Sequence, residues 1–307
     1  MAADGEALAE KIRRLKAEKR AIILAHNYQR PEVQDIADYV GDSIELSRKA
    51  MEERDAKLIV FSAVDFMAQT GAILNPEKKV VVPTPRARCP MAQMLPPQVA
   101  RQARERYPTA PLVLYVNTLA ETRALGDICC TSANAVEVVR SVDSDTFLFG
   151  PDYNLGKYIE KQTGKTMIPV PEYGFCPTHI RILKDDVLLV RERHPDAPLV
   201  VHPECLIEVQ EIADFIGSTS QICRYARECK AKRIIIGTEV GVLHRLQLEN
   251  PGKEFIPACD EAVCPNMKMN TLENIYLALR DESYPVSVPA GMAEGARRCL
   301  ERMFSLK

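Results

Sequence analysis

Three Cys-Pro dipeptides recur at nearly equal distances along this chain of 307 residues. They are Cys89-Pro90, Cys176-Pro177 and Cys264-Pro265. Successive cysteines lie 87 and 88 residues apart, and each follows a lysine, a short apolar run and a proline, as in Lys79-Val-Val-Val-Pro83. Internal repeats have to be recognised before any other feature of a fold, because each copy is one structural unit. The spacing therefore predicts three related units, each contributing one cysteine.

Further segments recur in the same order in all three units. Each unit begins with an apolar run that ends in polar residues: Ala21-Ile-Ile-Leu-Ala-His26-Asn-Tyr28, Leu112-Val-Leu-Tyr115-Val-Asn117 and Leu199-Val-Val-His202-Pro-Glu204. An acidic residue and then a hydroxyl residue follow: Asp38 and Ser43, Asp127 and Ser132, Asp214 and Thr219. Several anchors in one order make chance a poor explanation of the repeat.

The pattern inside each unit predicts an α/β fold. The apolar runs span four to six residues and are rich in Val, Ile and Leu, which is typical of parallel strands buried on both faces. We expect three strands per unit with helices between them; segment 35–40, for example, lies between the first two strands. We therefore predict three pseudo-threefold-related αβα sandwich domains with parallel sheets and an active site at their central junction. The expected limits are residues 1–94, including an N-terminal helix, 95–181 and 182–269, with closing helices at 270–307.

Charge and hydropathy exclude several classes of partner. The formal net charge is −2, so nothing indicates a nucleic-acid surface or a polybasic membrane patch. No apolar run is long enough to span a bilayer. Residues 1–20 are charged and helix-like and lack the apolar core of a signal peptide. We expect a cytoplasmic protein.

The ten cysteines favour an iron–sulfur cluster. Disulfides are disfavoured in a reducing compartment, and no paired C-x-x-C arms of a zinc ribbon are present. Cys89, Cys176 and Cys264 are predicted to meet only after folding and to ligate a 4Fe–4S cluster, which leaves one iron open to a substrate. The alternative is that cysteine is a small buried hydrophobe. We apply that alternative to Cys129, Cys130, Cys223, Cys229 and Cys299.

Polar side chains follow the predicted strands, at the sheet edge where parallel α/β folds bind ligands. They are His26, Tyr28, Tyr115, Asn117, His202 and Glu204. Glu204 and the histidines are candidates for proton transfer, although any one of them taken alone fits a packed structural residue. The hydroxyl residues that precede helical patterns fit either helix N-caps or an anion site. His179 is a weaker candidate, and we interpret His194 and His244 as surface residues.

Several motifs together resemble those of quinolinate synthases over nearly the whole chain. They are His26-Asn-Tyr28, Ala87-Arg-Cys-Pro-Met91, Tyr115-Val-Asn117, Cys129-Cys-Thr-Ser-Ala-Asn134, Phe175-Cys-Pro-Thr-His179, His202-Pro-Glu-Cys205 and Cys264-Pro-Asn-Met-Lys-Met-Asn270. The resemblance implies a transferase with an oxygen-sensitive 4Fe–4S cluster. Such an enzyme condenses iminoaspartate with dihydroxyacetone phosphate to quinolinate, phosphate and water for NAD biosynthesis. It also implies a transient partner, the enzyme that supplies iminoaspartate.

The resemblance also implies roles for particular residues. Three cysteines match the cluster ligands: Cys89, Cys176 and Cys264. Four residues match the acid/base group: Tyr28, Glu204, His26 and His202. Others match groups that contact the substrate or hold its carboxylate and phosphate: Tyr115, Asn117, Ser132, Ser43, Ser218 and Thr219. This chain departs from some members in lacking a C-x-x-C-x-x-C run near Cys264, and it carries Arg88 where the family usually has a small residue.

Two other classes of function remain open from the residues alone. One is a different cluster-dependent hydro-lyase acting on a hydroxy diacid, which would use the same open iron. The other is a non-enzymatic cluster sensor or a zinc-stabilised scaffold. A sensor or scaffold has no need for polar residues at three equivalent strand ends, so the enzyme classes are favoured.

Overall fold

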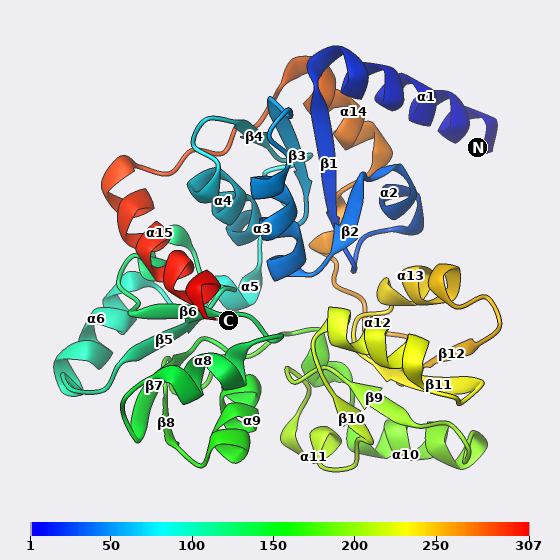
Figure 1. Ribbon diagram of the computed structural model, residues 1–307. Helices are drawn as coiled ribbons and strands as arrows, with labels where there is room; N and C mark the ends of the chain where they lie inside the picture. Colours follow the sequence, from blue (N-terminus) through cyan, green and yellow to red (C-terminus); the bar gives the residue numbers. More distant parts are fainter. Residues whose placement is uncertain (1, 307) are drawn as a thin grey trace.

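The computed structural model describes residues 2–306, which form three parallel four-stranded sheets (Figure 1). The strands of the first sheet are β1 (Ala21–His26), β2 (Tyr39–Gly41), β3 (Leu58–Ser62) and β4 (Lys79–Val81). Those of the second are β5 (Leu112–Tyr115), β6 (Ile128–Cys130), β7 (Thr146–Gly150) and β8 (Thr166–Pro169). Those of the third are β9 (Leu199–Val201), β10 (Phe215–Ile216), β11 (Arg233–Gly237) and β12 (Glu254–Pro257).

The three sheets share one strand order, which confirms the predicted α/β architecture of three αβα units. The orders are β2-β1-β3-β4, β6-β5-β7-β8 and β10-β9-β11-β12. Each sheet draws its strands from one continuous part of the chain, and Figure 1 shows the sheets as three lobes around a common centre. The limits of the units remain a prediction.

Helices connect the strands and cover both faces of each sheet. Those of the first unit are α1 (Ala2–Lys19), α2 (Pro31–Ile36), α3 (Ser43–Glu52), α4 (Asp65–Leu74) and α5 (Pro90–Gln93). The second unit has α6 (Pro97–Arg106), α7 (Ala120–Arg123), α8 (Ala135–Ser141), α9 (Tyr153–Thr163) and the 3₁₀ turn η1 (His179–Arg181). The rest are α10 (Lys184–Arg193), α11 (Ile207–Gln210), α12 (Thr219–Glu228), α13 (Val242–Glu249), η2 (Met267–Met269), α14 (Leu272–Asp281) and α15 (Ala290–Ser305).

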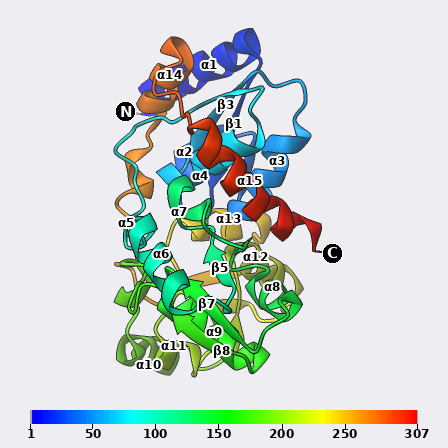
Figure 2. The same ribbon diagram turned by 90° about the vertical axis from the view of Figure 1, so that its left-hand side faces the viewer.

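The two closing helices pack on different units. Successive residues of β1 point to opposite faces of the first sheet, because strand side chains alternate. Ile23 belongs to an apolar cluster with Ile12 of α1 and Ile275 of α14, whereas Leu24 belongs to the cluster that contains α3 and α4. Helix α15 contacts α4, α7 and β6 (Figures 1 and 2). The C-terminal segment therefore covers the first sheet and ties it to the second.

The prediction of three strands per unit is wrong, because each sheet has a fourth, short edge strand. These strands are β2, β6 and β10, which contain only two or three residues each. Segment 35–40 is divided between the end of α2 and the start of β2. A strand this short shows no period-two pattern, and only pairing with the neighbouring strand defines it.

A repeated aspartate hydrogen-bonds an amide near the start of the first long strand in each unit, namely β1, β5 or β9. Asp38 accepts a hydrogen bond from the Ile23 amide at 2.7 Å. Asp127 and Asp214 make the same contact with the amides of Leu112 and Leu199, at 2.8 and 2.7 Å. A basic residue pairs with each carboxylate: Lys16, Arg104 and Arg191. The acidic anchors of the sequence repeat are therefore structural.

We expect Asp127→Ala to lower the free energy of unfolding by about 1–2 kcal/mol, because it leaves the buried Leu112 amide without its acceptor. The ion pair with Arg104 adds little, since both side chains are partly exposed. Denaturant melts of the variant and of Asp143→Ala, an exposed acidic residue, measure the difference. Equal stability of the two variants would contradict the anchoring role.

Candidate functional site

The three Cys-Pro loops open into one cavity at the junction of the three units. Cys89 precedes α5, Cys176 lies three residues before η1, and Cys264 lies three residues before η2. All three side chains are half-buried and line a cavity of ≈ 170 Å³. Burial raises the pKa of each thiol, and the charge of a neighbouring cysteine of the set adds to the shift at Cys89 and Cys176. The three thiols therefore face one space, as predicted.

A backbone amide three residues further along is directed at each sulfur. The amides of Ala92, His179 and Met267 hydrogen-bond the thiols of Cys89, Cys176 and Cys264. Each of these bonds lowers the thiol pKa and opposes the effect of burial. The repeat thus reproduces the loop and its polar surroundings as well as the cysteine.

Glu204 lies at the centre of the polar wall of the cavity. Its carboxylate accepts a hydrogen bond of 2.6 Å from the Tyr115 hydroxyl and lies 2.9 Å from His179 Nδ1. His202 stacks on His179, with 4.8 Å between the ring centroids, and its Nε2 lies 3.2 Å from the Ser132 hydroxyl. The second and third units therefore contribute to one hydrogen-bonded group.

A second branch of this group leads to Tyr28. The Tyr28 hydroxyl lies 2.6 Å from the hydroxyl of Thr238, which lies 2.8 Å from His179 Nε2. His179 Nδ1 is also 3.1 Å from Cys176 Sγ. Tyr28, Thr238, His179 and Glu204 thus form a continuous chain of proton-bearing groups that passes beside one cysteine.

Burial and neighbouring charges set the protonation of these groups. Burial lowers the pKa of His26 and of His202 to about 3, so both rings are neutral near pH 7. Burial raises the pKa of Glu204, but His179 and His202 outweigh burial and hold that pKa below its usual value. Burial and the Glu204 charge raise the pKa of Tyr28 and Tyr115 well above 10. The Glu204 carboxylate therefore lies among the neutral imidazoles of His26 and His202 and the protonated phenols of Tyr28 and Tyr115.

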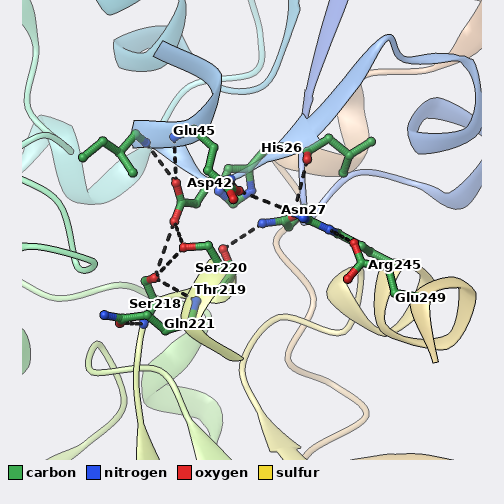
Figure 3. Close-up of polar contacts among 12 residues, drawn as sticks. His26, Asn27, Asp42, Glu45, Ser218, Thr219, Ser220, Gln221, Arg245 and Glu249 are labelled. Carbon is green, nitrogen blue, oxygen red and sulfur yellow. Dashed lines mark hydrogen bonds and ion pairs between the residues drawn. The ribbon is translucent and has the colours of Figure 1, made fainter. Parts of the chain in front are cut away.

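Helix N-termini from two units meet at one side of the cavity (Figure 3). Asp42 caps α3 in a capping box and accepts a hydrogen bond of 2.6 Å from the Ser220 hydroxyl of α12. Ser218 caps α12, and the Asn27 side-chain amide donates to the Thr219 hydroxyl at 2.8 Å. Ser218 fits the helix-cap interpretation, while hydroxyls and free amides at two helix N-termini also suit an anion.

Comparison with known proteins agrees with this geometry. A family model described as "Quinolinate synthetase A protein" matches residues 10–305. The quinolinate synthase of Thermotoga maritima is 50% identical over 299 residues, which cover 97% of this chain and 99% of that protein. The quinolinate synthase of Thermococcus onnurineus is 53% identical over 301 residues, covering 98% and 99%. This chain belongs to the quinolinate synthase family.

Twelve of the residues predicted for a quinolinate synthase site line the cavity. They are His26, Tyr28, Ser43, Cys89, Tyr115, Asn117, Ser132, Cys176, His202, Glu204, Thr219 and Cys264. Ser218 is fully buried in the α12 cap and is not among the lining residues. His194 and His244, interpreted as surface residues, are half-buried and contact Arg233 and Asp35. The catalytic and binding roles of the predicted residues remain predictions.

Some residues of the site were underestimated or missed from the sequence. His179 is central to the hydrogen-bonded group although its position outside the strand ends made it a weaker candidate. Thr238 follows β11, and the residues at this position after the other third strands, Ala63 and Pro151, differ in type, so the repeat gave no signal for it. Asp42 was missed as well, because the comparison of the three units used the neighbouring hydroxyl residue, Ser43, as the repeated position.

The site contains a group of side chains with metal-binding character. Cys176, His179 and Glu204 each offer one ligand atom, and these atoms lie within 4.8 Å of one another. A quinolinate synthase with this arrangement has donors for a metal at the cavity wall.

In the described part of the chain, no helix combines the length and apolar character needed to cross a membrane.

Proposed function

We propose that this protein condenses iminoaspartate with dihydroxyacetone phosphate to give quinolinate, phosphate and water, as a transferase of NAD biosynthesis. The observation that supports this most is the convergence of three Cys-Pro loops and the Glu204 group on one cavity in a member of the quinolinate synthase family. We further propose that it works in the cytoplasm and that a transient contact with the enzyme supplying iminoaspartate delivers that substrate.

The cysteines of the cavity fit an iron–sulfur cluster. Three thiols from three units face one space, each with an amide directed at its sulfur, and thiolates are the usual ligands of such clusters. Cys89, Cys176 and Cys264 are the proposed ligands of one 4Fe–4S cluster per chain. When bound through three thiolates, the cluster supplies a Lewis-acidic iron with an open coordination position.

The chain's own residues supply binding and proton transfer. Among the described residues, Glu204 is the only carboxylate that contacts both Tyr115 and His179, so it is the proposed general base. The neutral rings of His26 and His202 and the protonated phenol of Tyr28 are suited to donate or accept single protons beside it. Asn117 and Ser132 line the same wall and are proposed to orient the substrate.

The phosphate and carboxylate groups are proposed to bind where α3 and α12 begin. The first residue of α3 is Ser43, and the first residue of α12 is Thr219, which follows its cap Ser218. Helix N-termini attract anions through their free amides and their dipoles. Asp42 lies between the two helices, so an anionic ligand there has to compete with this carboxylate for the hydroxyls of α12.

Anaerobic purification with iron and sulfide analysis, combined with an assay for quinolinate, tests this proposal. We expect about four iron and four sulfide atoms per chain, because the proposed cluster has that composition. Iron without sulfide would support a single metal at Cys176, His179 and Glu204 instead. A cluster with dehydration of a hydroxy diacid but no quinolinate would identify a hydro-lyase and contradict the proposed reaction.

Thr238→Val is expected to lower kcat roughly tenfold, the effect of one hydrogen bond of about 1.4 kcal/mol. The change removes the hydroxyl between Tyr28 and His179 and keeps the shape of the side chain. Cluster content should not change, because Thr238 contacts no cysteine in the hydrogen bonds of the described residues. Steady-state kinetics beside Thr166→Val, an exposed control, measure the effect. An unchanged kcat would remove Thr238 from the proton path.

A further inference from the structure

Each unit places a carboxylate just after its third strand, close to its Cys-Pro loop. Asp65 follows β3, Asp152 follows β7 and Glu239 follows β11. They precede the cysteines of their units by 24, 24 and 25 residues. None of them appears among the motifs that relate the chain to its family, yet Asp65 and Glu239 each accept a hydrogen bond from the backbone of a cysteine.

In the first unit the contact is well defined. Asp65 Oδ1 accepts hydrogen bonds from the amides of Cys89 at 2.9 Å and Phe66 at 3.0 Å. The other oxygen, Oδ2, accepts from the side-chain amide of Gln93 at 3.2 Å and lies 3.5 Å from Arg88 Nε. Asp65 therefore joins the start of α4 to both ends of the first cysteine loop.

The third unit repeats the contact with a glutamate. Glu239 Oε1 accepts from the Cys264 amide at 2.9 Å, and Oε2 accepts from the Gly241 amide at 2.7 Å. Lys268, which lies beyond the cysteine, pairs with the same carboxylate at 2.9 Å. The Glu239 side chain is completely buried, so these contacts are its whole polar environment in the described residues. The carboxylate thus holds the third cysteine loop from both sides.

The second unit has the acid without the same hydrogen bond. Asp152 caps α9 by accepting from the Leu155 amide at 2.7 Å. Asp152 is completely buried, and its Oδ2 has no hydrogen-bond partner among the described residues. The cysteine amides of the first and third units are therefore the two that donate to a carboxylate of their own unit.

The three acids do not occupy one position of the repeat. Each loop is tied by a backbone hydrogen bond to the carbonyl two residues before its cysteine, with Asp65, Tyr153 and Val240 as the donors. Asp65 is itself the donor residue, whereas Asp152 and Glu239 stand one residue before it. The same carboxylate–amide contact is thus reached from two different positions. Because two different positions of the repeat supply the carboxylate, common ancestry of the units does not by itself explain the contact. This indicates that the cysteine loop requires the carboxylate.

We propose that Asp65 and Glu239 are positioning residues, each fixing the backbone of one cysteine so that its sulfur is held toward the shared cavity. The inference rests on the proposed function, since it takes the three cysteines as ligands of one metal cluster. Groups that orient metal ligands from behind typically change metal affinity 10–100-fold when they are lost. Ligands from three separate units have the most to gain from such support, because no short loop holds them together.

Iron release from the anaerobically loaded protein to a chelator tests the inference. Asp65→Ala and Glu239→Ala should release iron about 10–100-fold faster than the unchanged protein. Asp65→Asn and Glu239→Gln should stay within a few-fold of it, because a carboxamide oxygen still accepts from the cysteine amide. Asp260→Ala is the matched control, an exposed acid four residues before Cys264. Visible and electron paramagnetic resonance spectra follow the cluster independently of turnover.

The outcomes separate this inference from the function on which it rests. If the protein without substitutions takes up no iron and sulfide, the proposed cluster itself is overturned. A loaded protein whose alanine variants release iron at the unchanged rate would overturn only the positioning role. If the alanine variants do not fold, Asp65→Glu and Glu239→Asp replace them. Each moves the carboxylate by about one bond, ~1.5 Å, and should still accelerate iron release.

Discussion

Cys176→Ala is expected to remove the visible absorption of the cluster and the quinolinate-forming activity together. Cys176 is the proposed ligand from the second unit, so its loss leaves two proposed ligands, Cys89 from the first unit and Cys264 from the third. Loss of a group behind a metal ligand already costs about 10–100-fold in affinity, and loss of the ligand itself should cost more. We therefore expect less than about a hundredth of the unchanged activity. Anaerobic absorption spectra, iron and sulfide content and the quinolinate assay measure both effects.

The matched control for this experiment is another half-buried cysteine. Cys259 lies five residues before Cys264 and contacts the Arg181 carbonyl, and it does not line the cavity. Cys259→Ala should keep the spectrum and the activity. Full cluster content with full activity in Cys176→Ala would refute the ligand assignment, whatever the control does.

The threefold architecture was predictable because the repeat recurs in chemistry as well as in hydropathy. Cysteines at a period of 87 and 88 residues located the three loops, and the recurring apolar runs located the first strand of each unit. One anchor was misaligned by one residue. Lys165 and Lys253 donate to carbonyls in the last turns of α8 and α12, and Lys78, rather than Lys79, makes this contact with α3. The sequence did not reveal this shift, because Lys78 and Lys79 are adjacent and only the contact with α3 distinguishes them.

The site was predictable where function follows strand ends and was missed where it depends on contacts between units. His26 and Tyr115 end β1 and β5, and Glu204 lies three residues after β9, so the rule for parallel sheets located them. Thr238 and His179 meet Tyr28 only because three units pack around one cavity. No pattern within one unit encodes that meeting. The same limit applies to Asp42, whose partners on α12 belong to a different sheet.

Glu204→Gln should keep the cluster but lower kcat by about 10²–10⁴-fold, the usual contribution of a general base. Glutamine has nearly the same shape, and its carboxamide oxygen can still accept the hydrogen bond from Tyr115. It carries no charge and takes up no proton near neutral pH. The loss should therefore appear in kcat more than in KM, because substrate contacts elsewhere in the cavity are unchanged. Anaerobic kinetics together with iron and sulfide analysis measure both quantities.

A matched variant separates the charge of Glu204 from general damage. Glu208 lies four residues further along in α11 and is exposed, so Glu208→Gln should leave both cluster and turnover unchanged. If Glu204→Gln loses the cluster as well, the carboxylate supports the metal group through His179 and Cys176 rather than acting as the base. Normal turnover with a full cluster would exclude Glu204 as the base. The proton path would then have to begin at Tyr28, the other end of the same hydrogen-bonded chain.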